Sequence, residues 1–279
     1  AASCVATREK WLFNLGSSAK VGADYIARHA EPDPDPRPAE TKKIVSEAKP
    51  ILSVENATVT YNGQFVGLHE TTLDFNRGDF TVLLGPSGAG KTTLLRVLNG
   101  LVPLSSGQVR ADDLGLLTGK KIWRSHQQST AMIFQQYQLI ERHSALQNVL
   151  MGRLPFRSEW KSFLPWNESE KRISLECLER VGLLSKARER VSNLSGGQMQ
   201  RVGIAKALAQ EPKLVLADEP VSSLDPATAE QVISFLKEIC VASGITAIVS
   251  LHQVELARKF ADRLIGISAG QVSFDGKPQ

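Results

Sequence analysis

The sequence lacks the features that mark several large classes of protein. No stretch approaches the roughly 18 consecutive apolar residues that a membrane-spanning helix needs, and none forms the long apolar core of a secretory signal. Lys and Arg are not gathered into one stripe, and the formal net charge of the 279 residues is only +4. We therefore expect a chain that does not cross a membrane by itself and does not bind nucleic acid.

Cysteine is also scarce. Cys4, Cys177 and Cys240 are far apart in the chain, odd in number, and not part of any CxxC pair. Disulfide frameworks and zinc sites need paired or closely spaced ligands, so neither is indicated. Free thiols in a reducing compartment fit better, with the cytoplasm as the default location.

Residues 1–50 differ in texture from the rest of the chain. The run EPDPDPRP at 31–38 alternates proline with charge, which favours an extended linker over a helix interior or a central strand. The large apolar residues before it follow no helical period. We expect a poorly ordered N-terminal extension, with a short interface or membrane-surface helix as the alternative. The chain begins with Ala, which leaves open whether this N-terminus is the native one.

From about Ile51 onward the pattern is that of a globular α/β domain. Alternation over 51–61 predicts one strand, and apolar runs at 80–85, 214–218 and 245–252 predict buried strands. Helical patterns follow the buried runs. Strand–helix alternation of this kind predicts a mainly parallel sheet with helices on both faces. The polar, helix-rich stretch 137–200 predicts a helical subdomain inserted into this core.

A glycine-rich turn between a predicted strand and a predicted helix matches G-x-x-x-x-G-K-[ST]. Such a turn directs backbone N–H groups onto phosphate oxygens, and the following helix adds the positive end of its dipole. Lys91 is expected to hold the β- and γ-phosphates, and the Thr92 hydroxyl to bind Mg²⁺. The expected nucleotide-binding residues here are Gly85, Pro86, Ser87, Gly88, Ala89, Gly90, Lys91, Thr92 and Thr93.

Two acids end the run LVLADE. Asp218 is expected at the carboxyl end of a buried strand, where a carboxylate can hold the water shell of Mg²⁺. Glu219 follows and is placed to orient or deprotonate an attacking water. The alternative, two solvated charges at a strand end, is less favoured behind a phosphate-binding turn.

A second glycine-bearing turn, NLSGGQMQR at 193–201, has no role in a single phosphate cradle. It resembles the signature loop of the ATP-binding cassette (ABC) family. Other positions match that family in the same order: an adenine-stacking aromatic, the Q-loop glutamine, the D-loop acid and the switch histidine. These residues are Tyr61, Gln135, the signature loop Leu194, Ser195, Gly196, Gly197 and Gln198, then Asp225 and His252.

The resemblance implies a fold, an activity and an assembly. The fold is α/β: a P-loop NTPase (RecA-like) core with an antiparallel β subdomain and an inserted α-helical signature subdomain, over residues 51–279. ATP and Mg²⁺ are the implied cofactors, with Thr92, Gln135 and Asp218 at the metal. Lys91, Gln135, Glu219 and His252 are the implied catalytic residues. Two copies would pack head to tail, each ATP lying between one cradle and the partner's signature loop, and hydrolysis would separate them.

Because no membrane span is fused to the cassette, we expect that the closing and separation of the two copies drives a separate integral membrane permease. The segment 151–166 carries Phe156, Trp160, Phe163 and Trp166 and is a candidate for gripping that partner. The alternative is a small satellite core within the helical subdomain.

The sequence further resembles ATP-binding subunits of phosphonate importers, departing from them in residues 1–50 and over Val109–Lys121. This implies a peripheral position on the cytoplasmic face of a bacterial inner membrane and indirect work with an extracytoplasmic solute-binding protein. The alternatives are the same kind of ATPase subunit in an importer of phosphite, a phosphate ester or an amino acid, or a cassette ATPase that does not act in transport. The segments that carry the resemblance are LLRVLNGL, MIFQQYQLI, NVLMGRL, RVGLLSKA, LADEPVSSLDP and SLHQVELARKFADRLIGISAGQVSFDG.

Overall fold

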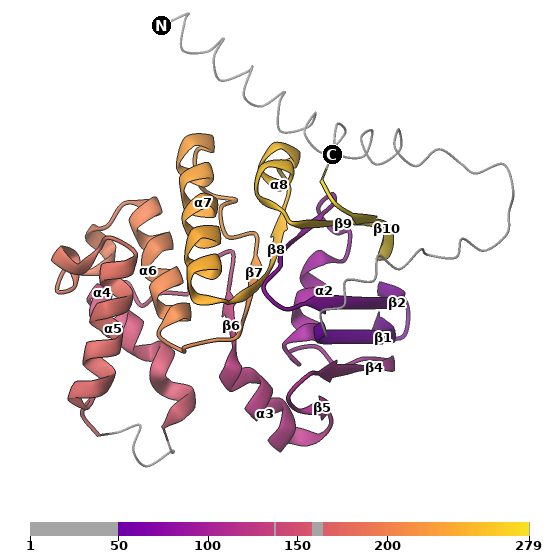
Figure 1. The fold of residues 1–279 in the computed structure, drawn as a ribbon, viewed down its shortest axis with the longest axis horizontal. Helices are drawn as coiled ribbons and strands as arrows, with labels where there is room; N and C mark the ends of the chain where they lie inside the picture. Colours follow the sequence, from indigo (N-terminus) through magenta and orange to yellow (C-terminus); the bar gives the residue numbers. More distant parts are fainter. Residues whose placement is uncertain (1–49, 137, 158–163, 279) are drawn as a thin grey trace, which may run out of the picture.

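The computed structural model describes residues 50–136, 138–157 and 164–278 (Figure 1). The predicted extension and linker in residues 1–49 lie outside the described residues, as does Cys4. Cys177 and Cys240 are buried free thiols, as the sequence predicted.

A six-stranded sheet forms the centre of the fold. Its strand order is β10-β9-β3-β8-β7-β6, and every pair is parallel except β10 with β9. The mainly parallel sheet predicted from the alternation is therefore confirmed, and the three of its strands that were predicted, β3, β7 and β8, have ends within one residue of the predicted ones. The strands are β3 (Phe80–Leu84), β6 (Thr130–Ile133), β7 (Leu214–Asp218), β8 (Thr246–Leu251), β9 (Arg263–Ser268) and β10 (Gln271–Gly276).

Both faces of this sheet are covered. Along β3, Phe80, Val82 and Leu84 pack into a core shared with the helices that follow β6, β7 and β8, whereas Leu83 packs into a second core shared with α2 and the other sheet. Alternate side chains of a strand point to opposite faces, so a strand buried on both faces is mostly apolar along its whole length. The covering helices are α2 (Lys91–Leu98), α7 (Pro226–Ser243) and α8 (Val254–Phe260), with the helix α3 (Gly119–Ser129) before β6.

A second sheet of four antiparallel strands, in the order β2-β1-β4-β5, packs beside α2. It begins with a hairpin in which Asn62 and Gly63 take φ values of 51° and 70°, the left-handed geometry of a tight hairpin turn. The stretch Val109–Lys121, irregular in the sequence comparison, holds the end of β4, the short β5 and the start of α3. The strands are β1 (Pro50–Tyr61), β2 (Phe65–Asn76), β4 (Ser106–Ala111) and β5 (Gly115–Leu116).

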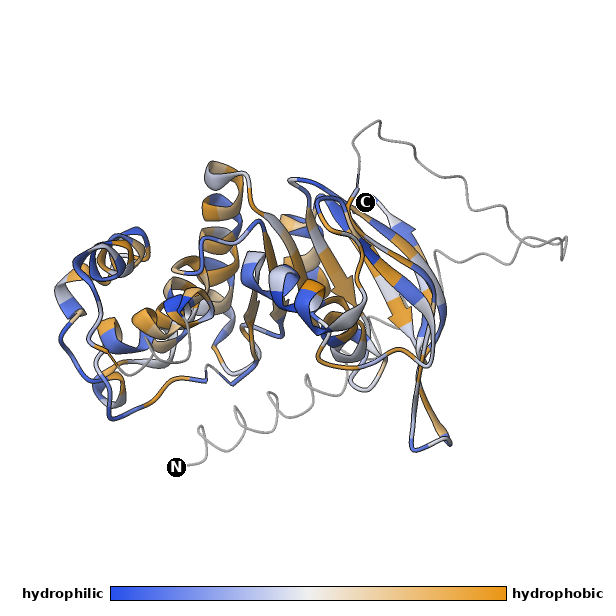
Figure 2. Cartoon of the chain, turned by 90° about the horizontal axis from the view of Figure 1, so that it is seen from below, coloured by the Kyte–Doolittle hydropathy of each residue, from blue (hydrophilic) through white to orange (hydrophobic). Residues whose placement is uncertain are grey.

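Most of the chain between β6 and β7 is helical and lies at the end of the molecule away from the antiparallel sheet (Figure 1). The predicted α/β class, with a separate antiparallel sheet and an inserted helical segment, is confirmed; the predicted limits of that segment, 137–200, stay a prediction. Hydrophobic residues line the central strands and the helix faces turned toward them (Figure 2). In the part of the chain that is described, no helix has the length and apolar character to span a bilayer. The helices are α4 (Ala145–Leu150), α5 (Glu168–Arg180) and α6 (Gly196–Leu208), with 3₁₀ turns η1 (Met151–Phe156), η3 (Leu184–Lys186) and η4 (Val191–Asn193).

Candidate nucleotide site

The glycine-rich turn, residues 85–92, connects β3 to α2 and is called the phosphate cradle below. Gly90 is the N-cap of α2 and has a φ of 107°. A Cβ at Gly85 would lie 2.1 Å from the carbonyl oxygen of Ile267, so the loop passes too close to β9 for any other residue. The cradle thus ends at a helix N-terminus, where free N–H groups and the helix dipole favour an anion.

Lys91 folds back over the cradle. Its Nζ donates hydrogen bonds to the carbonyl oxygens of Gly85 and Pro86 at 2.7 and 2.9 Å. The same Nζ lies 3.4 Å from Nδ1 of His252 and 4.0 Å from Oε1 of Glu219. Burial lowers the pKa of Lys91, and the charges of Glu219 and Asp218 partly offset that effect. An ammonium held in this position is available to a bound phosphate.

Asp218 joins the cradle to the neighbouring strands. It ends β7, and its Oδ1 accepts hydrogen bonds from the hydroxyls of Thr92 at 2.9 Å and Ser250 at 3.0 Å. The predicted pair Thr92 and Asp218 is therefore brought together. Ser250 was not predicted; the one available signal was a polar residue inside an apolar strand, two positions before His252.

Glu219 and His252 also meet, as predicted for two catalytic residues. Nε2 of His252 donates to Oε1 of Glu219, while Nδ1 of His252 lies 3.2 Å from the carbonyl oxygen of Gly85. The hydrogen bond from His252 is the main cause that lowers the pKa of Glu219; the charges of His252 and Lys91 act in the same direction, against burial. Glu219 therefore carries its negative charge beside the phosphate cradle.

Tyr61 lies at the side of the cradle. Its hydroxyl is 3.2 Å from the Thr93 hydroxyl, and its ring stacks on Phe65 with centroids 6.4 Å apart and planes 28° apart. Phe65 was not predicted for this site and is largely exposed. Stacking of an adenine ring on Tyr61 stays a prediction.

The second glycine-bearing turn does not reach this cradle within one chain. Ser195 caps α6 through a capping box: the Gln198 N–H donates to the Ser195 hydroxyl, and the Ser195 N–H donates to Oε1 of Gln198 at 3.0 Å. Such a cap leaves the hydroxyl hydrogen of Ser195 free to donate outward. Among the described residues, no hydrogen bond or ion pair joins residues 194–198 to Lys91, Asp218 or Glu219.

Asp225 caps the next long helix, α7. Its carboxylate accepts the Thr228 N–H at 3.0 Å, and hydrogen bonds from Thr228 are the main cause that lowers the pKa of Asp225. The same turn approaches the signature loop, because a Cβ at Gly197 would lie 2.8 Å from Cγ2 of Thr228. The start of α7, which Asp225 caps, therefore lies next to the signature loop.

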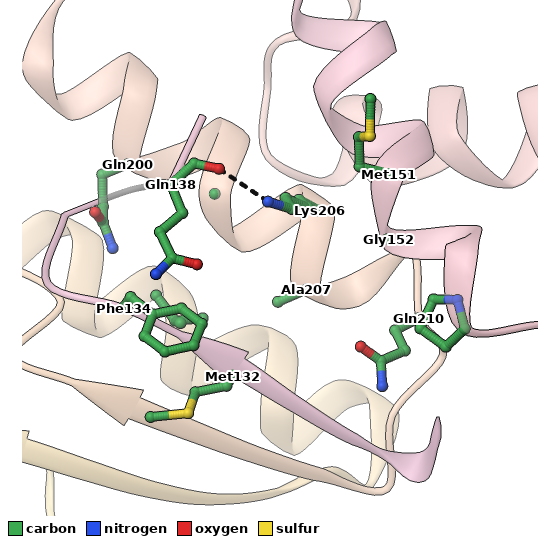
Figure 3. A pocket seen from close by; sticks show the side chains of 12 residues that line it. Met132, Phe134, Gln138, Met151, Gly152, Gln200, Lys206, Ala207 and Gln210 are labelled. Atoms are coloured by element: carbon green, nitrogen blue, oxygen red, sulfur yellow. Dashed lines mark hydrogen bonds between the residues drawn. The ribbon is translucent and has the colours of Figure 1, made fainter. Parts of the chain in front are cut away.

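Gln135 follows β6 and is exposed. In residues 50–136, 138–157 and 164–278, no hydrogen bond connects it to Thr92 or Asp218, and its role at a metal stays a prediction. The chain around it borders a cavity of about 120 Å³ beside α6 (Figure 3). There Nζ of Lys206 donates to the carbonyl oxygen of Gln138 at 2.9 Å, and burial lowers the pKa of Lys206.

The metal expected here finds only part of its ligands in the protein. No group of three or more His, Cys, Asp or Glu side chains able to hold a metal occurs within the described residues. The hydroxyl of Thr92 and the carboxylate of Asp218 are hard oxygen donors next to a phosphate cradle. This set fits Mg²⁺, which is usually bound by one or two protein oxygens together with phosphates and water.

The aromatic segment 151–166 is only partly described, since Trp160 and Phe163 lie outside the described residues. Phe156 is 48% exposed and carries the Arg153 guanidinium 4.5 Å from its ring centroid. Trp166 is covered in the same way by Arg157, also at 4.5 Å. The exposure of Phe156 favours the partner-binding interpretation over a satellite core for that residue.

Comparison with known proteins gives the same picture. The sequence profile of the family described as ABC transporter matches residues 68–222. The phosphonates import ATP-binding protein PhnC 3 of Nostoc sp. is 56% identical over 226 residues, covering 81% of this chain and 86% of that protein. The phosphite import ATP-binding protein PxtA of Stutzerimonas stutzeri is 55% identical over 228 residues, covering 82% of each.

Solved structures agree in fold. The dimeric post-hydrolysis state of the ATP-binding cassette MJ0796, bound to ADP and Pi, is 33% identical with a TM-score of 0.69, covering 82% of this chain and 99% of that one. The protein cbiO1 from Clostridium perfringens, part of the ABC transporter complex cbiONQ, is 29% identical with a TM-score of 0.73, covering 82% of this chain and 89% of that one.

Proposed function

The chain belongs to the ABC transporter family, and we propose that it is the ATP-hydrolysing subunit of an importer that takes up phosphonates through a separate permease. The observation that carries the proposal is one connected group of side chains. Thr92 donates a hydrogen bond to Asp218 at 2.9 Å, and the Lys91 ammonium lies beside both His252 and Glu219, which are hydrogen-bonded to each other. One phosphate cradle is therefore surrounded by a cation that can bind phosphate (Lys91), by a hydroxyl and a carboxylate that can bind a metal, and by an ionised carboxylate that can act as a base (Glu219).

The residues divide the work of phosphoryl transfer to water. The cradle's N–H groups and Lys91 hold the β- and γ-phosphates, and Thr92 and Asp218 hold Mg²⁺. When bound, the metal supplies charge neutralisation of the phosphate oxygens. Glu219 orients the attacking water and accepts its proton, while His252 fixes the Glu219 carboxylate and can donate to the γ-phosphate. Gln135 would sense the bound metal, the role that its place after β6 suggests.

The second glycine-bearing turn supports a dimer of two copies of the chain. Ser195 presents a hydroxyl donor at the N-terminus of α6, yet no hydrogen bond among the described residues of one chain joins it to the cradle. Two copies packed head to tail supply each cradle with the partner's signature loop and bring Asp225 to the interface. The cassette MJ0796, similar in fold, has been solved as a dimer.

The movement of this dimer during ATP binding and hydrolysis acts on membrane proteins that are separate polypeptides. We assign residues 51–279 to the cassette, residues 137–200 to its inserted helical subdomain and residues 1–50 to an N-terminal extension. The exposed Phe156 belongs to the surface that contacts the integral permease. Peripheral attachment to the cytoplasmic face of a bacterial inner membrane follows, with a solute-binding protein acting on the opposite side.

The identity of the transported solute is supported by sequence similarity alone. PhnC 3 is named for phosphonates and PxtA for phosphite, at nearly the same identity to this chain. Phosphite is therefore the second candidate. Both are small phosphorus oxyanions, and the permease and binding protein choose between them.

Growth of a deletion strain tests the assignment. The strain grows with phosphonate, phosphite or phosphate as the sole phosphorus source and is complemented with the wild-type chain or Glu219→Gln. Loss of growth on phosphonate alone, restored only by the wild type, is the expected result. Loss of growth on phosphite alone would make phosphite the transported solute in place of phosphonate. Unchanged growth on both, with no redundant importer present, would contradict the assignment as an importer subunit.

A further inference from the structure

Ser250 lies where the two acids of the site are held. It sits near the end of β8, is fully buried, and pairs in register with Asp218 on the adjacent parallel strand β7. Residues paired in this way point to the same face of a sheet. The Ser250 side chain therefore faces the end of β7, where the chain continues into Glu219.

The hydroxyl of Ser250 makes a hydrogen bond to each of the two acidic residues. It donates to Oδ1 of Asp218 at 3.0 Å and accepts the backbone N–H of Glu219 at 2.9 Å. With Thr92 donating to the same Oδ1, both donors on Asp218 meet at one oxygen, and neither of these bonds uses Oδ2. This fixes the rotation of the carboxylate and directs Oδ2 away from the two hydroxyls.

The backbone of Glu219 needs such a restraint. Its φ is 47°, in the left-handed region that residues with a side chain seldom adopt. Conformations of this kind persist only where the surroundings hold them. The Ser250 hydroxyl supplies the acceptor for the N–H of Glu219, and His252 holds the other end of the residue through Oε1.

We propose that Ser250 is a positioning residue of the ATPase site, which sets the carboxylate of Asp218 for Mg²⁺ and the left-handed backbone of Glu219 for water activation. This proposal rests on the proposed ATPase function. Ser250 touches neither nucleotide nor metal in this role; it acts through the two acids.

The chain offers a matched control on the same strand. Thr246 is also fully buried, and its hydroxyl accepts the Gly78 N–H at 2.9 Å, at the opposite end of β8 from the cradle. Ser250→Ala and Thr246→Val each remove one buried hydroxyl from β8. Only the first removes contacts to the acids, so a general loss of packing affects both variants and a loss of positioning affects one.

Steady-state hydrolysis with the full chain is the first readout. We expect Ser250→Ala to lower kcat about tenfold while KM for ATP stays within about twofold, because the acids are displaced and the phosphate-binding groups are not. Ser250→Thr, which keeps the hydroxyl, should recover most of the rate, and Thr246→Val should keep the wild-type kcat. A kcat for Ser250→Ala within about twofold of wild type, or an equal fall in Thr246→Val, would overturn the proposal.

Nucleotide binding gives a second readout that does not depend on turnover. The gain in ATP affinity on adding Mg²⁺ in place of EDTA should shrink about fivefold or more in Ser250→Ala and stay unchanged in Thr246→Val. An unchanged gain in Ser250→Ala would count against the proposal even if the wild type hydrolysed no ATP. A wild type that binds Mg²⁺–ATP without hydrolysing it would contradict the proposed function alone.

Discussion

Glu219 and His252 are 33 positions apart in the chain, yet Nε2 of His252 donates a hydrogen bond to Oε1 of Glu219. Lys91 Nζ approaches both, at 4.0 Å from the carboxylate and 3.4 Å from the imidazole. The parallel strands bring these residues together because β7, β8 and β3 are neighbours and end at the same edge of the sheet. A negative charge is thereby kept beside a cradle built for another anion.

Replacing Glu219 with Gln tests its assignment as the base. The amide keeps the size of the side chain but cannot take a proton from water, so we expect ATP hydrolysis to fall at least about 100-fold. ATP and Mg²⁺ should still bind, and an ATP-bound dimer should accumulate in light scattering. Glu230, on α7, forms an exposed ion pair with Lys259 on α8; Glu230→Gln is the control and should behave as the wild type. A Glu219→Gln chain that stays monomeric in saturating ATP and Mg²⁺ would count against the shared site.

The lowered pKa of Glu219 predicts a pH dependence of stability. Because this pKa is lower in the folded than in the unfolded chain, the charged carboxylate stabilises the fold above the ordinary value for Glu, and this stabilisation is lost as the pH falls through the folded value. His252→Ala removes the largest cause of the shift. Its free energy of unfolding should therefore lie below that of the wild type near neutral pH, and the gap should narrow below roughly pH 4.3.

Urea unfolding at several pH values measures this gap, with His69→Ala, a change at an exposed histidine, as the control. A gap that is the same at every pH would show that His252 does not act through the charge of Glu219.

Replacing Lys91 is predicted to abolish ATP binding without lowering the stability of the nucleotide-free chain. Burial lowers its pKa, so folding disfavours the charged form, and this unfavourable effect grows as the pH falls below the unfolded value. Lys91→Met should leave the melting temperature of the nucleotide-free chain unchanged or higher. ATP at about 100 times its Kd should stabilise the wild type by about 2.7 kcal/mol and the variant by almost nothing. Lys259→Met, at an exposed position, is the control, and a wild-type ATP shift in Lys91→Met would contradict the cradle assignment.

The exposed ring of Phe156 predicts a defect confined to transport. Phe156→Ala removes a side chain that is 48% exposed, so the ATPase rate of the isolated chain should stay within about twofold of wild type. Binding to the permease in detergent, and phosphonate uptake, should fall about tenfold if the ring anchors the interface. Val241→Ala removes an exposed apolar side chain on α7 as the control. Unchanged uptake in Phe156→Ala would remove this residue from the permease contact.

The buried strands could be predicted from the sequence because they are apolar on both faces. The runs that became β3, β7 and β8 hold five or six successive buried residues, and their ends were predicted to within one residue. The order of these strands could not be predicted, since pairing between distant segments leaves no local pattern. The helix α3 was not predicted either: its large apolar residues are only Ile122 and Trp123, too few to mark a helix in a polar stretch.

In the candidate site, too, features set by local sequence could be predicted and features set by strand order could not. Lys91, Thr92, Asp218 and Glu219 could be predicted because each stands at a fixed position next to a strand or helix end. Ser250 could not, because its role depends on which strand lies beside β7. Gln135 lies in an exposed bend with no hydrogen bond to Thr92 or Asp218 among the described residues, and its role at a metal stays a prediction.

The measurement that tests the account most directly is ATPase complementation between two inactive chains. Ser195→Asp keeps a good helix cap but places a negative charge where the partner's γ-phosphate is expected. Lys91→Met removes the cradle's cation. Each alone should be inactive, whereas their mixture forms a heterodimer with one intact site, made of the cradle of the first chain and the signature loop of the second. Recovery of hydrolysis only on mixing is the predicted result; a mixture as inactive as its parts, with dimers present, would contradict a site shared between two copies.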